Sequence, residues 1–126
     1  MKKLTQLYQV KEEQTALNMG SGDLEVLATP ALVAMMENCA KQLLAPELSS
    51  EQTSVGFKMT LKHLAPSAVG AEVKVEAEML ENERNKVSFS IKAFDEKQLI
   101  GEADHQRVIV AVSYTHLRAH ETSLHL

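Results

Sequence analysis

The stretch ATPALVAMMENCAKQLLAPEL, residues 28–48, is the one long segment that does not alternate like a β-strand, and it predicts a helix. Thr29 can cap free amides with its hydroxyl, and Pro30 suits the first helical position. Pro46 marks the expected end of the helix. From Ala31 to Leu44 the apolar residues cover nearly the whole circumference, which is typical of a buried helix.

The remaining segments alternate apolar and polar residues, which predicts antiparallel strands with one wet face. The residues expected to face inward are Val55, Phe57, Met59 and Leu61, then Val69, Ala71, Val73, Val75, Ala77 and Met79, then Val87, Phe89, Ile91 and Ala93. A last strand runs from about Leu99 through RVIVAV, and the first dozen residues are a weaker candidate. One buried helix with one alternating sheet predicts an α+β hotdog fold, a curved antiparallel sheet wrapped around one long central helix.

The length, the charge and the cysteine content of the chain limit the functional classes to which it can belong. The chain has 126 residues, a length that suits one domain, and a net charge of -4 without any basic run, which argues against nucleic-acid binding. Cys39 has no partner for a disulfide within the chain. No apolar run approaches the ~20 residues of a membrane span, and MKKLTQLYQV lacks the apolar region of a signal peptide. We therefore expect a cytoplasmic protein that binds neither nucleic acid nor membrane.

The C-terminal string VSYTHLRAHET, residues 112–122, resembles a translated sequencing-library adapter of the transposon-end type. We therefore expect residues 1–111 to form the hotdog domain and residues 112–126 to be a non-native tail. His116 and His120 have an i, i+4 spacing that could hold zinc on a helix, but the adapter interpretation removes them, and no metal site is predicted.

Glu37 is the anomaly of the predicted helix, because it places a carboxylate at its most buried part. Such a group needs a partner or a use. It could instead reach the helix edge or pair with a lysine. His63 continues the odd-numbered apolar face, so its ring should point toward the helix, although a core histidine bonded to backbone has the same pattern. Together they would form a secluded Glu–His pair, a common general-base arrangement.

Thr29 is the third candidate, since the start of a helix stabilises a developing oxyanion. A plain N-cap is the alternative. Thr29 and Glu37 are eight positions apart, roughly 12 Å along a helix axis at ~1.5 Å per residue. Side chains that far apart are poorly placed to share one carbonyl within a single chain. This predicts a site formed across a two-fold homodimer, with a dimer of dimers left open.

Three segments, ATPALVAMMENCA, SVGFKMTLKHLAPSAVG and GEADHQRVIV, resemble the fluoroacetyl-CoA thioesterase branch of the hotdog thioesterases, over residues 20 to 111. In that family a threonine opening the helix, a glutamate eight residues later and a histidine ending the next strand form the catalytic set. They fall on Thr29, Glu37 and His63. Gly56 matches a glycine of the family's strand motif. His105 and Arg107 match its late His-x-Arg, for which we expect a structural role.

The resemblance implies hydrolysis of an acyl-CoA to a free acid and CoA, with CoA as part of the substrate and no separate cofactor. Thr29 and nearby amides would bind the thioester carbonyl, Glu37 would act as nucleophile or as base, and His63 would move the proton. The fluoroacetyl-specific enzyme has aromatic residues just ahead of its helix. This chain has none between Tyr8 and Phe57, which favours a broader short acyl-CoA role.

The predicted substrate-binding residues are Pro30, Gly56, Lys58 and Lys62. The two lysines could bind CoA phosphates, or they could simply be solvated. A non-catalytic hotdog module that binds CoA or an acyl ligand is the alternative function. A hotdog dehydratase ranks last, because its histidine precedes the helix and no histidine of this chain precedes His63.

Overall fold

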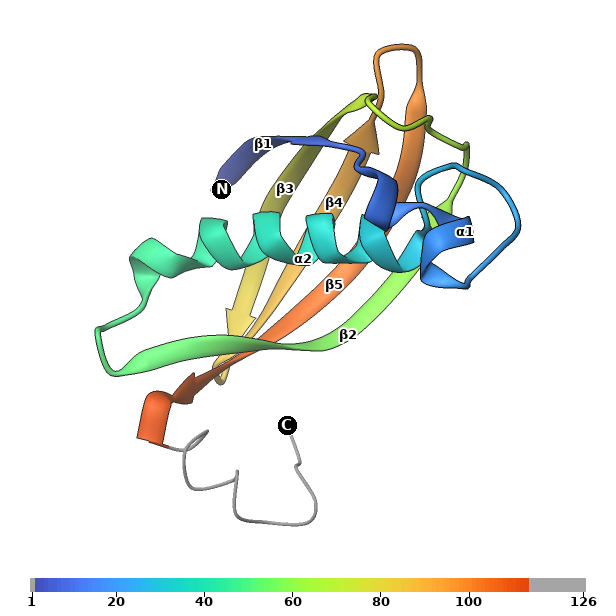
Figure 1. Ribbon diagram of the computed structural model, residues 1–126. Helices are drawn as coiled ribbons and strands as arrows, with labels where there is room; N and C mark the ends of the chain where they lie inside the picture. The colour runs from blue at the N-terminus through green and yellow to red at the C-terminus, as the bar shows by residue number, and fades with distance from the viewer. Residues whose placement is uncertain (1, 114–126) are drawn as a thin grey trace.

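The computed structural model describes residues 2–113, and within them one helix lies across a five-stranded antiparallel sheet (Figure 1). The strands are β1 (Lys3–Gln9), β2 (Gln52–His63), β3 (Glu72–Glu83), β4 (Lys86–Phe94) and β5 (Leu99–Ala111). Their order is β1-β3-β4-β5-β2, so β1 and β2 are the edges. The strand candidate at the N-terminus is confirmed as β1.

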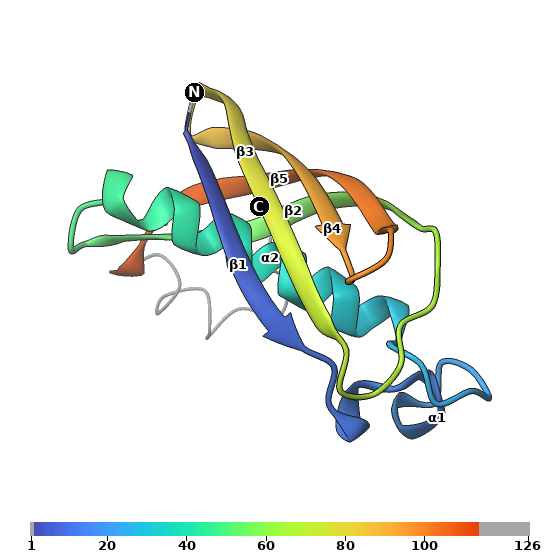
Figure 2. The same ribbon diagram turned by 90° about the horizontal axis from the view of Figure 1, so that it is seen from above.

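The long helix α2 (Thr29–Leu44) packs against the inner face of the sheet, which curves over it (Figure 2). Its residues facing the sheet are Ala31, Leu32, Met35, Met36, Cys39, Ala40, Leu43 and Leu44, all buried. The short helix α1 (Ala16–Met19) and two 3-10 turns, Glu12–Gln14 and Ala45–Glu47, complete the elements. The predicted hotdog architecture is confirmed.

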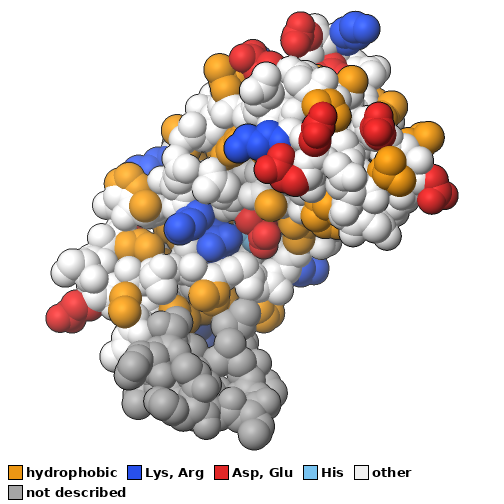
Figure 3. All heavy atoms as spheres, viewed as in Figure 1, with side chains coloured by type: hydrophobic (Ala, Val, Ile, Leu, Met, Phe, Trp, Pro, Cys, Tyr) orange, Lys and Arg blue, Asp and Glu red, His pale blue; other side chains and the backbone are white. Residues whose placement is uncertain are grey.

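The helix is less buried than its composition predicts. Pro30, Ala34, Lys41 and Gln42 are exposed, and Ala34 and Lys41 follow Pro30 and Ala34 at spacings of four and seven, which places these three on one side of α2. The sheet covers only the other side, so one helix face stays open in the single chain. Figure 3 shows basic and acidic side chains interspersed over this side of the molecule.

Two strands follow the predicted alternation closely. The inward residues Val73, Val75 and Ala77 of β3 and Val87, Phe89, Ile91 and Ala93 of β4 are all buried. The strand expected from Val69 begins instead at Glu72, and Val69 is exposed. Gly70 lies at a φ of 89° between them, a turn conformation that ends the alternation.

No helix among residues 2–113 is long and apolar enough to cross a membrane.

A β-bulge in β2 changes which residues of that strand face the helix. The register with β5 runs Gly56↔Arg107 and then Lys58↔Gln106, so Phe57 has no partner. An extra residue reverses the in–out alternation. Before the bulge Ser54 and Gly56 face inward, and after it Met59, Leu61 and His63 do. The prediction that Phe57 faces the core is wrong: its side chain is exposed under the Lys86 ammonium, 4.4 Å from the ring centre.

Candidate active site

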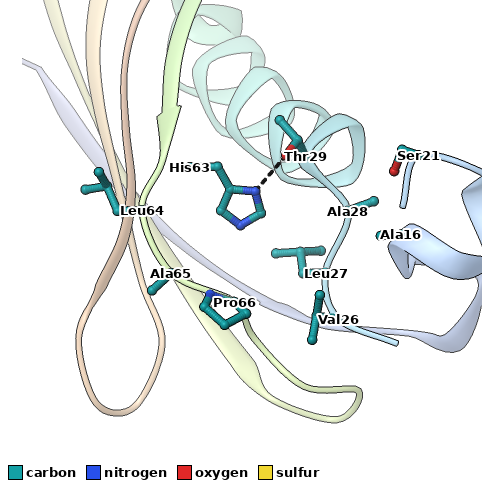
Figure 4. A pocket seen from close by; sticks show the side chains of 10 residues that line it. All are labelled: Ala16, Ser21, Val26, Leu27, Ala28, Thr29, His63, Leu64, Ala65 and Pro66. Carbon is teal, nitrogen blue, oxygen red and sulfur yellow. Dashed lines mark hydrogen bonds between the residues drawn. The ribbon is translucent and has the colours of Figure 1, made fainter. Parts of the chain in front are cut away.

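The amino end of α2 brings two of the predicted site residues together (Figure 4). Thr29 Oγ1 lies 2.8 Å from Nδ1 of His63, the last residue of β2. The prediction that Thr29 caps the helix is wrong, because Ala28 occupies the N-cap position and Thr29 is the first helical residue. Its hydroxyl therefore bonds the imidazole, and the inward direction predicted for His63 is confirmed.

The His63 imidazole stands at a pocket of about 360 Å³ between the end of β2 and the start of α2 (Figure 4). The lining is mainly aliphatic, with Ser21, Thr29 and His63 as its polar side chains; the others are Ala16, Val26, Leu27, Ala28, Leu64, Ala65 and Pro66. His63 Nε2 is buried and has no hydrogen-bond partner. It is the ring nitrogen that Thr29 does not contact.

Burial lowers the pKa of His63 below its ordinary 6.5, because desolvation disfavours the imidazolium. The ring is therefore neutral at pH 7. A neutral imidazole carries one proton on two nitrogens, so it can accept a proton at one atom and release one from the other. Thr29 holds the ring orientation through Nδ1.

Glu37 lies about two turns further along α2, half-buried, directly over Gly56 of β2. A Cβ on residue 56 would come within 2.7 Å of Glu37 Oε2. The missing side chain therefore leaves the space that the carboxylate occupies. The bulge turns Gly56 inward, whereas uninterrupted alternation would put it on the wet face.

Two buried polar residues of β5 lie beneath this carboxylate. His105 is 1% exposed and Arg107 is 6% exposed. The same Cβ position on residue 56 lies 3.7 Å from His105 Cε1 and 3.8 Å from Arg107 Nη1. Sequence reasoning gave both a structural role and missed this proximity. The available signal was a histidine and an arginine at inward positions of an apolar strand, where polar residues need partners.

The expected Glu37–His63 pair is not formed within the described chain. No hydrogen bond or ion pair among residues 2–113 joins the two side chains. The nearest imidazole to Glu37 is that of His105, whereas His63 is bonded to Thr29 at the start of the helix. The site residues thus form two halves on one helix, Thr29 with His63 and Glu37 with Gly56.

The predicted substrate-binding residues lie in different places. Pro30 is exposed beside Thr29, and Gly56 lies under Glu37. Lys58 and Lys62 are exposed on the outer face of β2, where Lys62 is opposite Glu102 of β5. Among residues 2–113, no cluster of His, Cys, Asp and Glu could hold a metal ion. His116, His120 and the remainder of the expected tail from residue 114 onward lie outside the described residues.

A family model described as fluoroacetyl-CoA-specific thioesterase matches residues 10–113. The chain belongs to this family. The resemblance seen in the three sequence segments is therefore confirmed. A curated relative in the family, the fluoroacetyl-CoA thioesterase of Streptantibioticus cattleyicolor, is 31% identical over 86 residues, which cover 68% of this chain and 62% of that protein.

Solved structures support the family and the fold. A variant of a fluoroacetyl-CoA-specific thioesterase in complex with fluoroacetate and CoA is 25% identical, with a TM-score of 0.85 over 90% of this chain and 95% of that chain. A hot-dog-like protein from Thermanaerovibrio acidaminovorans, 24% identical, has a TM-score of 0.86 over 98% of this chain and 92% of its own. The family thus supports the thioester hydrolase class expected from the sequence.

Proposed function

We propose that this chain hydrolyses short acyl-CoA thioesters to a free acid and CoA. The observation that carries the proposal is the Thr29–His63 pair: a neutral imidazole, held through Nδ1, lines a mainly aliphatic pocket, and its buried Nε2 has no hydrogen-bond partner. Membership of a thioesterase family supports the same reaction. A solved relative was captured with fluoroacetate and CoA, the two products of such a hydrolysis.

In the proposed reaction a water oxygen attacks the thioester carbonyl carbon and the C–S bond breaks. Glu37 accepts the water proton and passes it to the neutral His63 imidazole, and His63 delivers a proton to the leaving sulfur, so that both side chains return to their starting state. Thr29 and the amino end of α2 stabilise the negative charge that develops on the carbonyl oxygen. If Glu37 instead attacks the carbonyl carbon itself, the C–S bond breaks, CoA leaves and a mixed anhydride forms; water then cleaves the anhydride, which releases the acid and restores the Glu37 carboxylate.

We propose that the complete site forms across a homodimer, which can pair further into a dimer of dimers. Eight helix positions separate Thr29 from Glu37, roughly 12 Å at ~1.5 Å per residue. A two-fold axis would place Glu37 of one copy beside Thr29 and His63 of the other. The open face of α2 and the edge position of β2 leave surfaces for such a contact.

The substrate is proposed to be a short acyl-CoA without strict selectivity for fluorine. The described pocket lining has no Phe, Tyr or Trp side chain. Lys58 and Lys62 remain candidates for the CoA phosphates, and we propose a cytoplasmic location with no separate cofactor.

The decisive experiment is thiol release from a panel of short acyl-CoAs by the wild type and Glu37→Gln. Loss of a positioned base or nucleophile should lower kcat by ~10²–10⁴-fold. Glu81→Gln, an exposed charge change on β3, is the matched control and should leave kcat unchanged. Binding of CoA without thiol release by the wild type would favour the ligand-binding module instead.

A further inference from the structure

His105 makes a polar contact through each nitrogen of its ring, although the ring is almost completely buried. Nδ1 lies 2.7 Å from the carbonyl oxygen of Lys58, and Nε2 lies 3.3 Å from Nη1 of Arg107. A carbonyl oxygen only accepts, so Nδ1 must carry the proton. A guanidinium only donates, so Nε2 must be the unprotonated nitrogen. The two contacts together fix one neutral tautomer.

Arg107 is hydrogen-bonded to β2 on the other side of the bulge from Lys58. Its Nε donates to Ser54 Oγ at 2.9 Å, and its Nη2 donates to the Ser54 carbonyl at 3.1 Å. His105 bonds the Lys58 carbonyl, just after Phe57, and Arg107 bonds Ser54, two residues before Gly56. The two β5 side chains therefore clamp β2 on either side of the bulge.

This bulge is what allows both halves of the site to face the helix. Gly56 and His63 are seven positions apart, an odd number, so a regular strand would send them to opposite faces of the sheet. One extra residue between them brings both inward. Any slip of the bulge would turn either Gly56 away from Glu37 or His63 away from Thr29.

We propose that His105 is a positioning residue, which through its bond to the Lys58 carbonyl and its contact with Arg107 locks the β2 bulge and so sets Gly56 under the Glu37 carboxylate. The inference rests on the proposed hydrolysis. His105 does not line the Thr29–His63 pocket, and among the described residues it makes no hydrogen bond to Glu37, so we expect its effect to reach the reaction through β2 and Arg107.

Three variants separate positioning from packing. His105→Phe fills the core without either polar contact, and it should lower kcat by roughly 10–100-fold with little change in KM, because small misplacements cost that much. His105→Asn can still donate an N–H near the Nδ1 position and should recover part of the loss. Val73→Ala, a core truncation on β3, should lower Tm but leave kcat unchanged.

Wild-type kcat in His105→Phe would overturn the proposal, and so would a failure of His105→Asn to exceed His105→Phe. A loss of kcat in Val73→Ala equal to that in His105→Phe, at matched Tm, would also overturn it.

A second measurement does not depend on turnover. In protein labelled with ¹⁵N at histidine, NMR should show His105 as the Nδ1–H tautomer at neutral pH. The Nε2–H tautomer would overturn the clamp. Wild-type protein without thiol release would overturn the proposed function and the positioning role with it, and the tautomer would still decide whether the clamp exists.

Discussion

At the scale of single residues, the hydroxyl of Thr29 orients a histidine and does not cap the start of α2. Since it bonds His63 Nδ1, Thr29→Val should free the imidazole and lower kcat/KM by about 10–100-fold through lost orientation. Thr29→Ser keeps the hydroxyl and should keep most of the activity. Thiol-release kinetics on both variants are the measurement, and equal rates for the two would contradict the assigned role.

His63 and His105 should also make the fold depend on pH. Desolvation lowers the pKa of each imidazole in the folded chain below 6.5, so the unfolded chain takes up protons first as the pH falls. Their contribution to the free energy of unfolding is therefore present above pH 6.5 and is lost below it.

Thermal unfolding from about pH 8 to about pH 5.5 should accordingly show Tm falling with pH. The fall should be smaller in His63→Gln, which has no imidazole at that position to take up a proton. A Tm that falls as steeply in His63→Gln as in the wild type would contradict the neutral, buried state of His63.

At the scale of elements, the bulge in β2 decides the site, and Gly56→Ala tests it. The added Cβ would come within 2.7 Å of Glu37 Oε2, so the carboxylate must move. We expect kcat to fall at least about 10-fold. Gly70→Ala is the control: its φ of 89° makes alanine unfavourable, but a Cβ there meets nothing within 4 Å. It should lower Tm and leave kcat unchanged.

A comparison of β2 with β3 and β4 shows how far the sequence predicts the fold. Alternation correctly predicts β3 and β4, because every inward position there is apolar. It fails in β2, because Val55 and Phe57 continue an apolar alternation that the chain does not use. The one local signal was Gly56 inside the strand pattern, since an isolated glycine there suggests a bulge or a close backbone approach.

The helix shows a comparable limit. The position of the helix and its end near Pro46 follow from local signals. The N-cap, however, is Ala28, one residue before the predicted Thr29. That single residue moves the Thr29 hydroxyl from the backbone to His63. The residues around Glu37 come together only because β2 pairs with β5. This pairing is long-range, and spacing along the sequence does not predict it.

At the scale of the whole molecule, the central claim is that two copies share each site. The described chain holds Thr29 with His63 at one point of α2 and Glu37 with Gly56 about two turns away. The proposed reaction needs all of them around one thioester. A second copy would supply the missing half to each, as we propose.

Complementation between two inactive variants tests this claim most directly. Glu37→Gln and His63→Gln, coexpressed with different tags, would give a mixed dimer in which one site carries both substitutions and the other carries neither. If each site is shared by two copies, each variant alone should be nearly inactive and the purified mixed dimer should regain about half of the wild-type kcat per dimer. A mixed dimer as inactive as its parents would contradict it.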